Sequence, residues 1–363
     1  MLDLLNLRGL CILASAFSLF GCDGCSDDTS PSGGGGNPPT TGGSGGLGGG
    51  AGGAGGLGGE GGLGGALMCD PGEGVTFALT SVDFGNGPSG EWKAVGLNLD
   101  GLVSDELSTD VCLPSSGGDP ATAYPDGNDG IDNSFGKNLL PLLQALSPDW
   151  QAGVEMALAE GRFSAMVKMY CLPDTGDAAL VSKVFNGTDL GAVPLFDGTD
   201  EWPVAPEILG NPVDPESSTL VFENSSVVGS AFDSGSGETF VLTVPITFNN
   251  QTALLKLTLY GARVTMDLSD DRRSATNGII AGVLNTEEVV DQVKKIAFIE
   301  GLCEEATYQQ ILTTIRRASD ILADGTQDPT MTCDGMSFGL RFEMSEAQLG
   351  GVGPFAPVGM ACP

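Results

Sequence analysis

The sequence predicts a mainly β protein: an antiparallel β-sandwich decorated with a few inserted helices and stabilised by disulfides. First, apolar and polar residues alternate through 240–268 and 336–344, which is typical of antiparallel strands with one solvated face. Second, clear helical patterns are few, and the two longest lie between residues 286 and 322. Third, the body of the chain holds an even number of cysteines, as disulfide-bonded exported domains do.

The alternation at 240–268 predicts a β-hairpin with a turn at Asn249-Asn250. Pro245 predicts an edge strand or a bulge, because proline lacks the amide that an inner strand needs. Gly261 predicts a bend or bulge in the second strand. The apolar positions of the whole hairpin are Phe240, Leu242, Val244, Ile246, Phe248, Leu255, Leu257, Leu259, Val264, Met266 and Leu268.

Weaker patterns predict the remaining elements. Further strands are expected at 75–84, 94–99, 178–185, 220–232 and 279–284. Helices are expected at 139–146, 151–160, 286–299 and 304–322. Asn285 can cap the third of these helices. The prolines between 194 and 215 predict a long loop within one domain rather than a domain boundary.

The start of the chain predicts export. An apolar run, 9–20, follows Arg8 and is too short to cross a bilayer, which takes about 20 residues. Leu19-Phe20-Gly21-Cys22 resembles the lipobox of bacterial lipoproteins. That resemblance implies a signal peptide at 1–21 and a lipid-modified Cys22 carrying palmitate-type acyl chains. The alternative is an ordinary cleaved signal. An anchored protein would sit at the outer membrane or on the periplasmic side of the inner membrane.

Residues 22–68 are dominated by glycine and become a repeating X-Gly-Gly triplet from Ala51. This composition predicts a disordered tether that reaches roughly 35–40 Å and carries the globular body, 69–363. The alternative is packing of glycine helices between neighbouring chains.

The charge and the missing histidine exclude several functions. The chain has 15 Lys+Arg against 47 Asp+Glu, a net charge of −32. Such a surface repels nucleic acid, so no nucleic-acid partner is expected. With no histidine, neither a Ser-His-Asp triad nor an imidazole zinc site can form. Carboxylate chemistry, a Ser-Lys pair or a cysteine-rich metal site remain open.

Six cysteines lie in the body, without a CxxC pair, so disulfides are favoured over a metal site. We expect Cys303–Cys333, across one helix and the strand after it. The other expected pairs are Cys112–Cys171 and Cys69–Cys362.

Closely spaced oxygen-bearing side chains between 126 and 133 suit calcium, which takes six to eight oxygen ligands. Asp-Gly-Ile-Asp-Asn at 129–133 resembles repeats of thrombospondin type 3 domains and metal-binding repeats of myxobacterial surface proteins. The alternative is a string of turns leading into a helix. The candidate ligands are Asp126, Asn128, Asp129, Asp132 and Asn133.

Two Asp-Ser/Thr-Gly triplets, 174–176 and 233–235, resemble those of aspartic proteases. The alternative is that both are turns between strands. A glycosidase-like pair of carboxylates is a further option.

Two interpretations of function follow. One is a lipid-anchored cell-envelope protein whose extracytoplasmic β-rich module is structural or binds a protein or carbohydrate ligand, with calcium as a candidate stabiliser and without catalysis. The other is a carboxylate-dependent hydrolase, aspartic-protease-like or glycosidase-like. The order of segments, the cysteines and the strand pattern resemble lipoproteins of predatory and social deltaproteobacteria, a resemblance that implies no activity.

Overall fold

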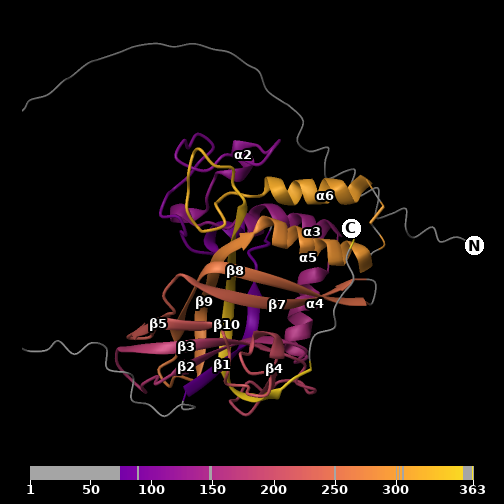
Figure 1. Ribbon diagram of the computed structural model, residues 1–363. Helices are drawn as coiled ribbons and strands as arrows, with labels where there is room; N and C mark the ends of the chain where they lie inside the picture. The colour runs from indigo at the N-terminus through magenta and orange to yellow at the C-terminus, as the bar shows by residue number, and fades with distance from the viewer. Residues whose placement is uncertain are drawn as a thin grey trace, which may run out of the picture. The chain divides into compact units, whose positions relative to one another are not determined.

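Ten strands form one sheet in the computed structural model (Figure 1). It describes residues 74–362 except 88–89, 147–148, 249–250, 300, 302, 305 and 355–361. The strands are β1 (Gly74–Asp83), β2 (Ser164–Tyr170), β3 (Ala178–Gly187), β4 (Glu201–Val204), β5 (Val221–Val228), β6 (Ala231–Asp233), β7 (Glu238–Phe248), β8 (Gln251–Leu268), β9 (Ser274–Asn285) and β10 (Gly335–Val352).

The strand pairings close on themselves. In order around the circuit, β1, β2, β3, β5, β6, β8, β9 and β10 pair antiparallel, and β10 pairs again with β1. β4 instead runs parallel to β10. The mainly β, antiparallel and disulfide-bonded fold is therefore confirmed. All ten strands belong to one continuous sheet.

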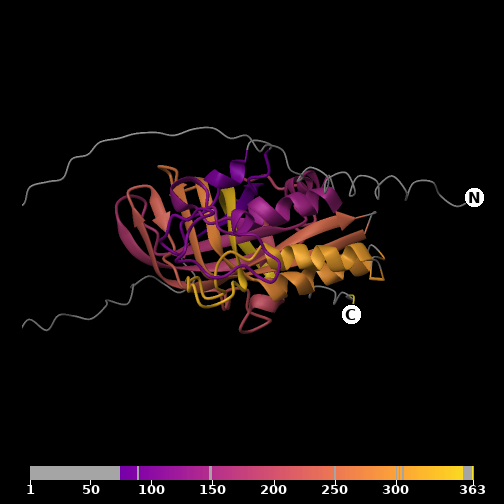
Figure 2. The ribbon, with the colours of Figure 1, turned by 90° about the horizontal axis from the view of Figure 1, so that it is seen from above.

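The helices lie outside this sheet (Figures 1 and 2). α5 packs on β8 and β9 and lies beside α6, while α4 packs on β1 and β7. Asn285 Oδ1 accepts hydrogen bonds from the amides of Glu287 and Glu288, so the predicted cap of α5 is confirmed. The helices are α2 (Pro120–Ala123), α3 (Leu140–Leu146), α4 (Trp150–Ala159), α5 (Thr286–Ile299) and α6 (Ala306–Arg317), with short turns η2 (Glu91–Ala94), η3 (Asn128–Gly130), η4 (Phe135–Leu139) and η5 (Pro206–Ile208).

The predicted hairpin forms between β7 and β8. β7 pairs with no other described strand, in agreement with the edge position that Pro245 predicts. Gly261 has a φ of 57° and lies where the pairing of β8 with both neighbours shifts register, as a bulge requires. The predicted turn at 249–250 lies outside the described residues.

Several predicted elements are wrong in extent or kind. Residues 94–99 form a turn and one isolated bridge, Leu97 to Asp132, because this segment pairs with a loop rather than with a strand. The stretch 220–232 divides into β5 and β6, with a turn at Gly229. The helix expected to reach residue 322 ends at Arg317, and β2 and β4 have no counterpart in the prediction.

A chain of aromatic contacts fixes the loops at one end of the sheet to the core. The ring centroid of Phe84, just after β1, lies 4.9 Å from that of Trp150 and 6.4 Å from that of Phe135. Phe135 in turn meets Phe338 of β10 edge to face at 4.9 Å. All four side chains are buried, so the chain on both sides of Phe135 is held against β1 and β10.

The disulfide pairs differ from those expected. Cys112 bonds Cys333, and Cys303 bonds Cys362. The expected pairs Cys303–Cys333, Cys112–Cys171 and Cys69–Cys362 are therefore wrong, although Cys171 is also disulfide-bonded. The sequence pattern could not show that the loop around Cys112 lies beside the segment just before β10, with Cys112 and Cys333 221 residues apart. These bonds are consistent with an oxidising, extracytoplasmic location.

No helix within the described ranges is long and apolar enough to span a membrane. Cys22, the predicted signal peptide and the predicted tether lie outside these ranges.

Candidate functional site

Two long loops meet at one end of the sheet, and we name them the distal loops: residues 97–133 and 320–334. β1 begins at Gly74 and ends at Asp83, which pairs with Arg341 near the start of β10. The loops follow β1 and precede β10, so they lie at the opposite end of β1 from Gly74. In Figure 1 this is the end marked by α2, and β4 lies at the other end.

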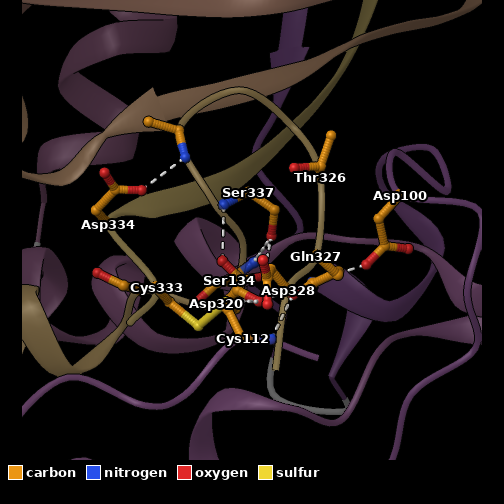
Figure 3. The surroundings of a disulfide bond; sticks show 12 residues. Asp100, Cys112, Ser134, Asp320, Thr326, Gln327, Asp328, Cys333, Asp334 and Ser337 are labelled. Carbon is orange, nitrogen blue, oxygen red and sulfur yellow. Dashed lines mark hydrogen bonds between the residues drawn. A yellow bond between two sulfur atoms is a disulfide. The ribbon is translucent and has the colours of Figure 1, made fainter. Parts of the chain in front are cut away.

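The Cys112–Cys333 disulfide joins the distal loops (Figure 3). Next to it, the amide of Leu113 donates to Met331 O (2.7 Å), and the amide of Cys333 donates to Leu113 O (2.8 Å). Gln327 adds a side-chain bridge: its Oε1 accepts from Cys112 N (2.8 Å), and its Nε2 donates to Asp100 (2.8 Å) and to Asp320 O (3.1 Å). The two loops therefore form one hydrogen-bonded unit.

Asp320 connects this unit to β10. Its carboxylate accepts two hydrogen bonds from Ser337, one from the amide and one from the hydroxyl. Ser337 Oγ also accepts from Ser134 N (2.8 Å), and Ser134 Oγ donates to Ala318 O (2.5 Å). Burial raises the pKa of Asp320 to about 7, with the hydrogen bonds from Ser337 opposing the shift.

Two of the candidate calcium ligands lie close to Asp320. Asp132 is buried, and its Oδ2 accepts from Leu99 N at 2.6 Å. Burial, then repulsion from Asp100 and Asp320, raises its pKa to about 9. Asp126 Oδ2 accepts from Ser104 N at 2.5 Å, and burial raises its pKa to about 6. Both shifts favour the protonated carboxyl over the carboxylate, most strongly at Asp132.

Lys137 interacts electrostatically with Asp126 and Asp320. Its Nζ donates to Pro125 O at 2.9 Å, and burial lowers its pKa to about 8 despite the attraction of Asp320 and Asp126. The cluster thus combines buried or partly buried acids, one partly buried lysine and hydrogen bonds to the loop backbone.

The five candidate calcium ligands do not share one environment. Asn128 and Asp129 are exposed, whereas Asp132 and Asn133 are buried. Both ends of the Asn133 amide are used, since Nδ2 donates to Val95 O and Oδ1 accepts from the amides of Gly136 and Gly339. Within the described ranges, no three acidic or cysteine side chains are placed to hold a metal ion.

The two Asp-Ser/Thr-Gly triplets are not brought together. Asp174 lies in the turn before β3, Asp233 ends β6, and β5 lies between these two strands. Both Asp233 carboxylate oxygens bond Arg263, which lowers the pKa of that carboxyl. Asp233 also accepts from Gly235 N at 2.9 Å, as expected for a turn. The geometry therefore opposes the proton-sharing pair of an aspartic protease.

A polar cleft at the other end of β1 was not predicted. It has a volume of about 290 Å³ and is lined in part by Thr76, Lys168, Glu216, Glu346 and Gln348. Lys168 is buried, with its Nζ 2.5 Å from Glu216 Oε1, and Tyr170 Oη donates to the other oxygen of Glu216 at 2.8 Å. The sequence feature that could have indicated this cleft is Lys168, a lysine inside the otherwise apolar run 165–169.

Comparison with protein families, curated proteins and solved structures found no match to this chain.

Proposed function

We propose that this protein is a lipid-anchored module of the bacterial cell envelope that acts by binding rather than by catalysis. The observation that carries the proposal is the disulfide-bonded, closed β-sheet, a construction suited to an oxidising compartment. Cys22 supplies the anchor in this proposal, and residues 23–68 separate the module from the membrane.

The contacts of the acidic side chains support a structural rather than a catalytic role for these acids. Asp320, Asp132 and Asp126 accept hydrogen bonds from the amides of Ser337, Leu99 and Ser104. Carboxylates used in this way hold loops in place. The ligand is a protein or a carbohydrate, and the donors and acceptors of the polar cleft suit the hydroxyl groups of a sugar.

Lipid attachment can be tested by growing the producing bacterium with an alkyne analogue of palmitate and detecting label on the protein. The full-length chain should be labelled and recovered with membranes. Cys22→Ser should abolish both, whereas Cys25→Ser, three residues away, should retain both. Equal labelling of the two variants would refute the anchor at Cys22.

One observation favours the second candidate, a carboxylate-dependent hydrolase. Asp126 interacts with Asp132, and both have raised pKa values, as the acid groups of hydrolases often do. The test measures release of peptides from casein and of nitrophenol from nitrophenyl glycosides. Activity that is lost in Asp132→Asn but kept in Asp129→Asn, with unchanged folding, would favour a hydrolase.

A further inference from the structure

Four large apolar side chains project into solvent from the distal loops. Two of them are neighbours, because the amide of Leu113 donates to Met331 O. Single exposed apolar residues are ordinary, but a group on adjoining loops marks a candidate contact surface. The exposed fractions are 74% for Val103, 79% for Leu107, 46% for Leu113 and 51% for Met331.

Hydrogen-bonded turns fix the backbone at two of these residues, Leu107 and Met331. Asp105 Oδ1 accepts from Leu107 N at 2.8 Å, and Asp328 Oδ1 accepts from Thr330 N at 2.8 Å, directly before Met331. The disulfide and Gln327 then join the two loops. A surface held in this way loses little conformational entropy when a partner binds.

Charge indicates what kind of partner would fit. The distal loops contain twelve Asp and Glu and no Lys or Arg. Seven of the acids are exposed: Asp105, Glu106, Asp110, Asp119, Asp129, Asp324 and Asp334. The nearby cations lie outside the loops, at Lys93, Lys137 and Arg317, the last of which lies beside Gly117. Such a surface attracts positive charge and repels acidic chains.

We propose that the distal loops form a docking surface for a cationic, amphipathic protein segment in which lysine or arginine flanks apolar side chains. The apolar residues of the partner would contact Leu113 and Met331, and its cations would meet the surrounding carboxylates. This inference names the partner of the proposed binding module and therefore rests on that function.

The test uses the full chain with Cys22→Ser, so that no acyl group contributes. A fluorescent peptide of lysine and leucine is titrated, and a peptide of equal length and charge made of lysine and serine is the control. We expect the leucine peptide to bind more tightly. Leu113→Ser with Met331→Ser should weaken the affinity for the leucine peptide about tenfold, as expected when the apolar residues at the centre of an interface are removed.

Matched variants elsewhere separate this surface from general acidity. Val193→Ser with Leu195→Ser removes two apolar residues of another loop that are even more exposed than Leu113 and Met331, and it should change the affinity less than about twofold. Glu106→Gln with Asp110→Asn should weaken binding and its salt dependence more than Glu201→Gln with Glu223→Gln. Melting temperatures confirm that each variant is folded.

Three outcomes would overturn the docking surface: no binding of the leucine peptide, equal binding of both peptides, or equal losses in the distal and control variants. None of these outcomes bears on acylation of Cys22, which is measured separately. Absence of palmitate label on the chain that keeps Cys22, with intact peptide binding, would instead refute the anchor alone.

Discussion

Asp320 and Ser337 are joined at two points: the Ser337 amide donates to Oδ1 at 2.9 Å, and its hydroxyl donates to Oδ2 at 2.5 Å. The same hydroxyl accepts from Ser134 N. One side chain on β10 therefore holds the segment after α6 and the segment before η4. Both segments belong to, or border, the distal loops.

Ser337→Ala should lower the free energy of unfolding by about 1–3 kcal/mol, because it leaves the buried amide of Ser134 and one oxygen of Asp320 without a partner. Denaturant unfolding measures the loss. Ser116→Ala, at an exposed position in the same loops, should change stability by no more than about 0.5 kcal/mol. Equal effects of the two substitutions would contradict the role of Ser337.

Stability should fall as pH rises between about 5 and 7. Asp126, Asp320 and Asp132 have raised pKa values of about 6, 7 and 9, so the folded protein keeps protons that the unfolded chain has already released. Each retained proton contributes a slope of about 1.4 kcal/mol per pH unit. Asp132→Asn should flatten the slope, whereas Asp129→Asn should preserve it. A stability that rises across this range would show that the three acids are ionised in the fold.

Calcium should leave the melting temperature at pH 8 unchanged relative to a chelator. The reason is that Oδ2 of Asp126 and Oδ2 of Asp132 each accept an amide hydrogen bond, and the Asn133 side chain is bonded at both ends, so three of the expected ligands already have protein partners. An increase produced by calcium and lost in Asp132→Asn would instead establish a calcium site in the distal loops.

Replacing both Cys112 and Cys333 by serine should lower the free energy of unfolding by about 2–5 kcal/mol, because the bond closes a very long loop and is buried. Thermal unfolding with and without reductant measures the loss. In reductant the stabilities of wild type and variant should become alike, because the remaining disulfides are then reduced in both. Wild type and variant of equal stability without reductant would show that this bond contributes nothing.

The loss of stability should depend on which partner of the Lys168–Glu216 pair is removed. Glu216→Ala leaves the buried ammonium of Lys168 without that carboxylate and should cost about 1–3 kcal/mol. Lys168→Met keeps the packing of the stem, removes the buried charge and should cost less. Chemical denaturation of the two variants gives the comparison, and a larger loss for Lys168→Met would contradict it.

The sequence by itself was enough to predict those features that depend only on residues close together in the chain. The alternation in 240–268, the edge position of Pro245, the bulge at Gly261 and the cap at Asn285 all depend on neighbouring residues, and each is seen in the structure. The alternation of apolar and polar residues likewise indicated a mainly β body, since burial of one face of a strand leaves a two-residue period. The even number of cysteines in the body indicated disulfides. Acylation of Cys22 and the tether remain predictions.

Tertiary structure alone decided the rest, because it depends on which distant segments meet. The partner of Cys112 is set by the pairing of its loop with residues just before β10, more than two hundred positions away. The environment of the acids is decided in the same way: Asp132 is buried, and burial with repulsion from Asp100 and Asp320 raises its pKa, while Asp129, three residues earlier, faces solvent. Local spacing cannot distinguish these two aspartates, since desolvation and charge repulsion come from the residues that folding brings around them.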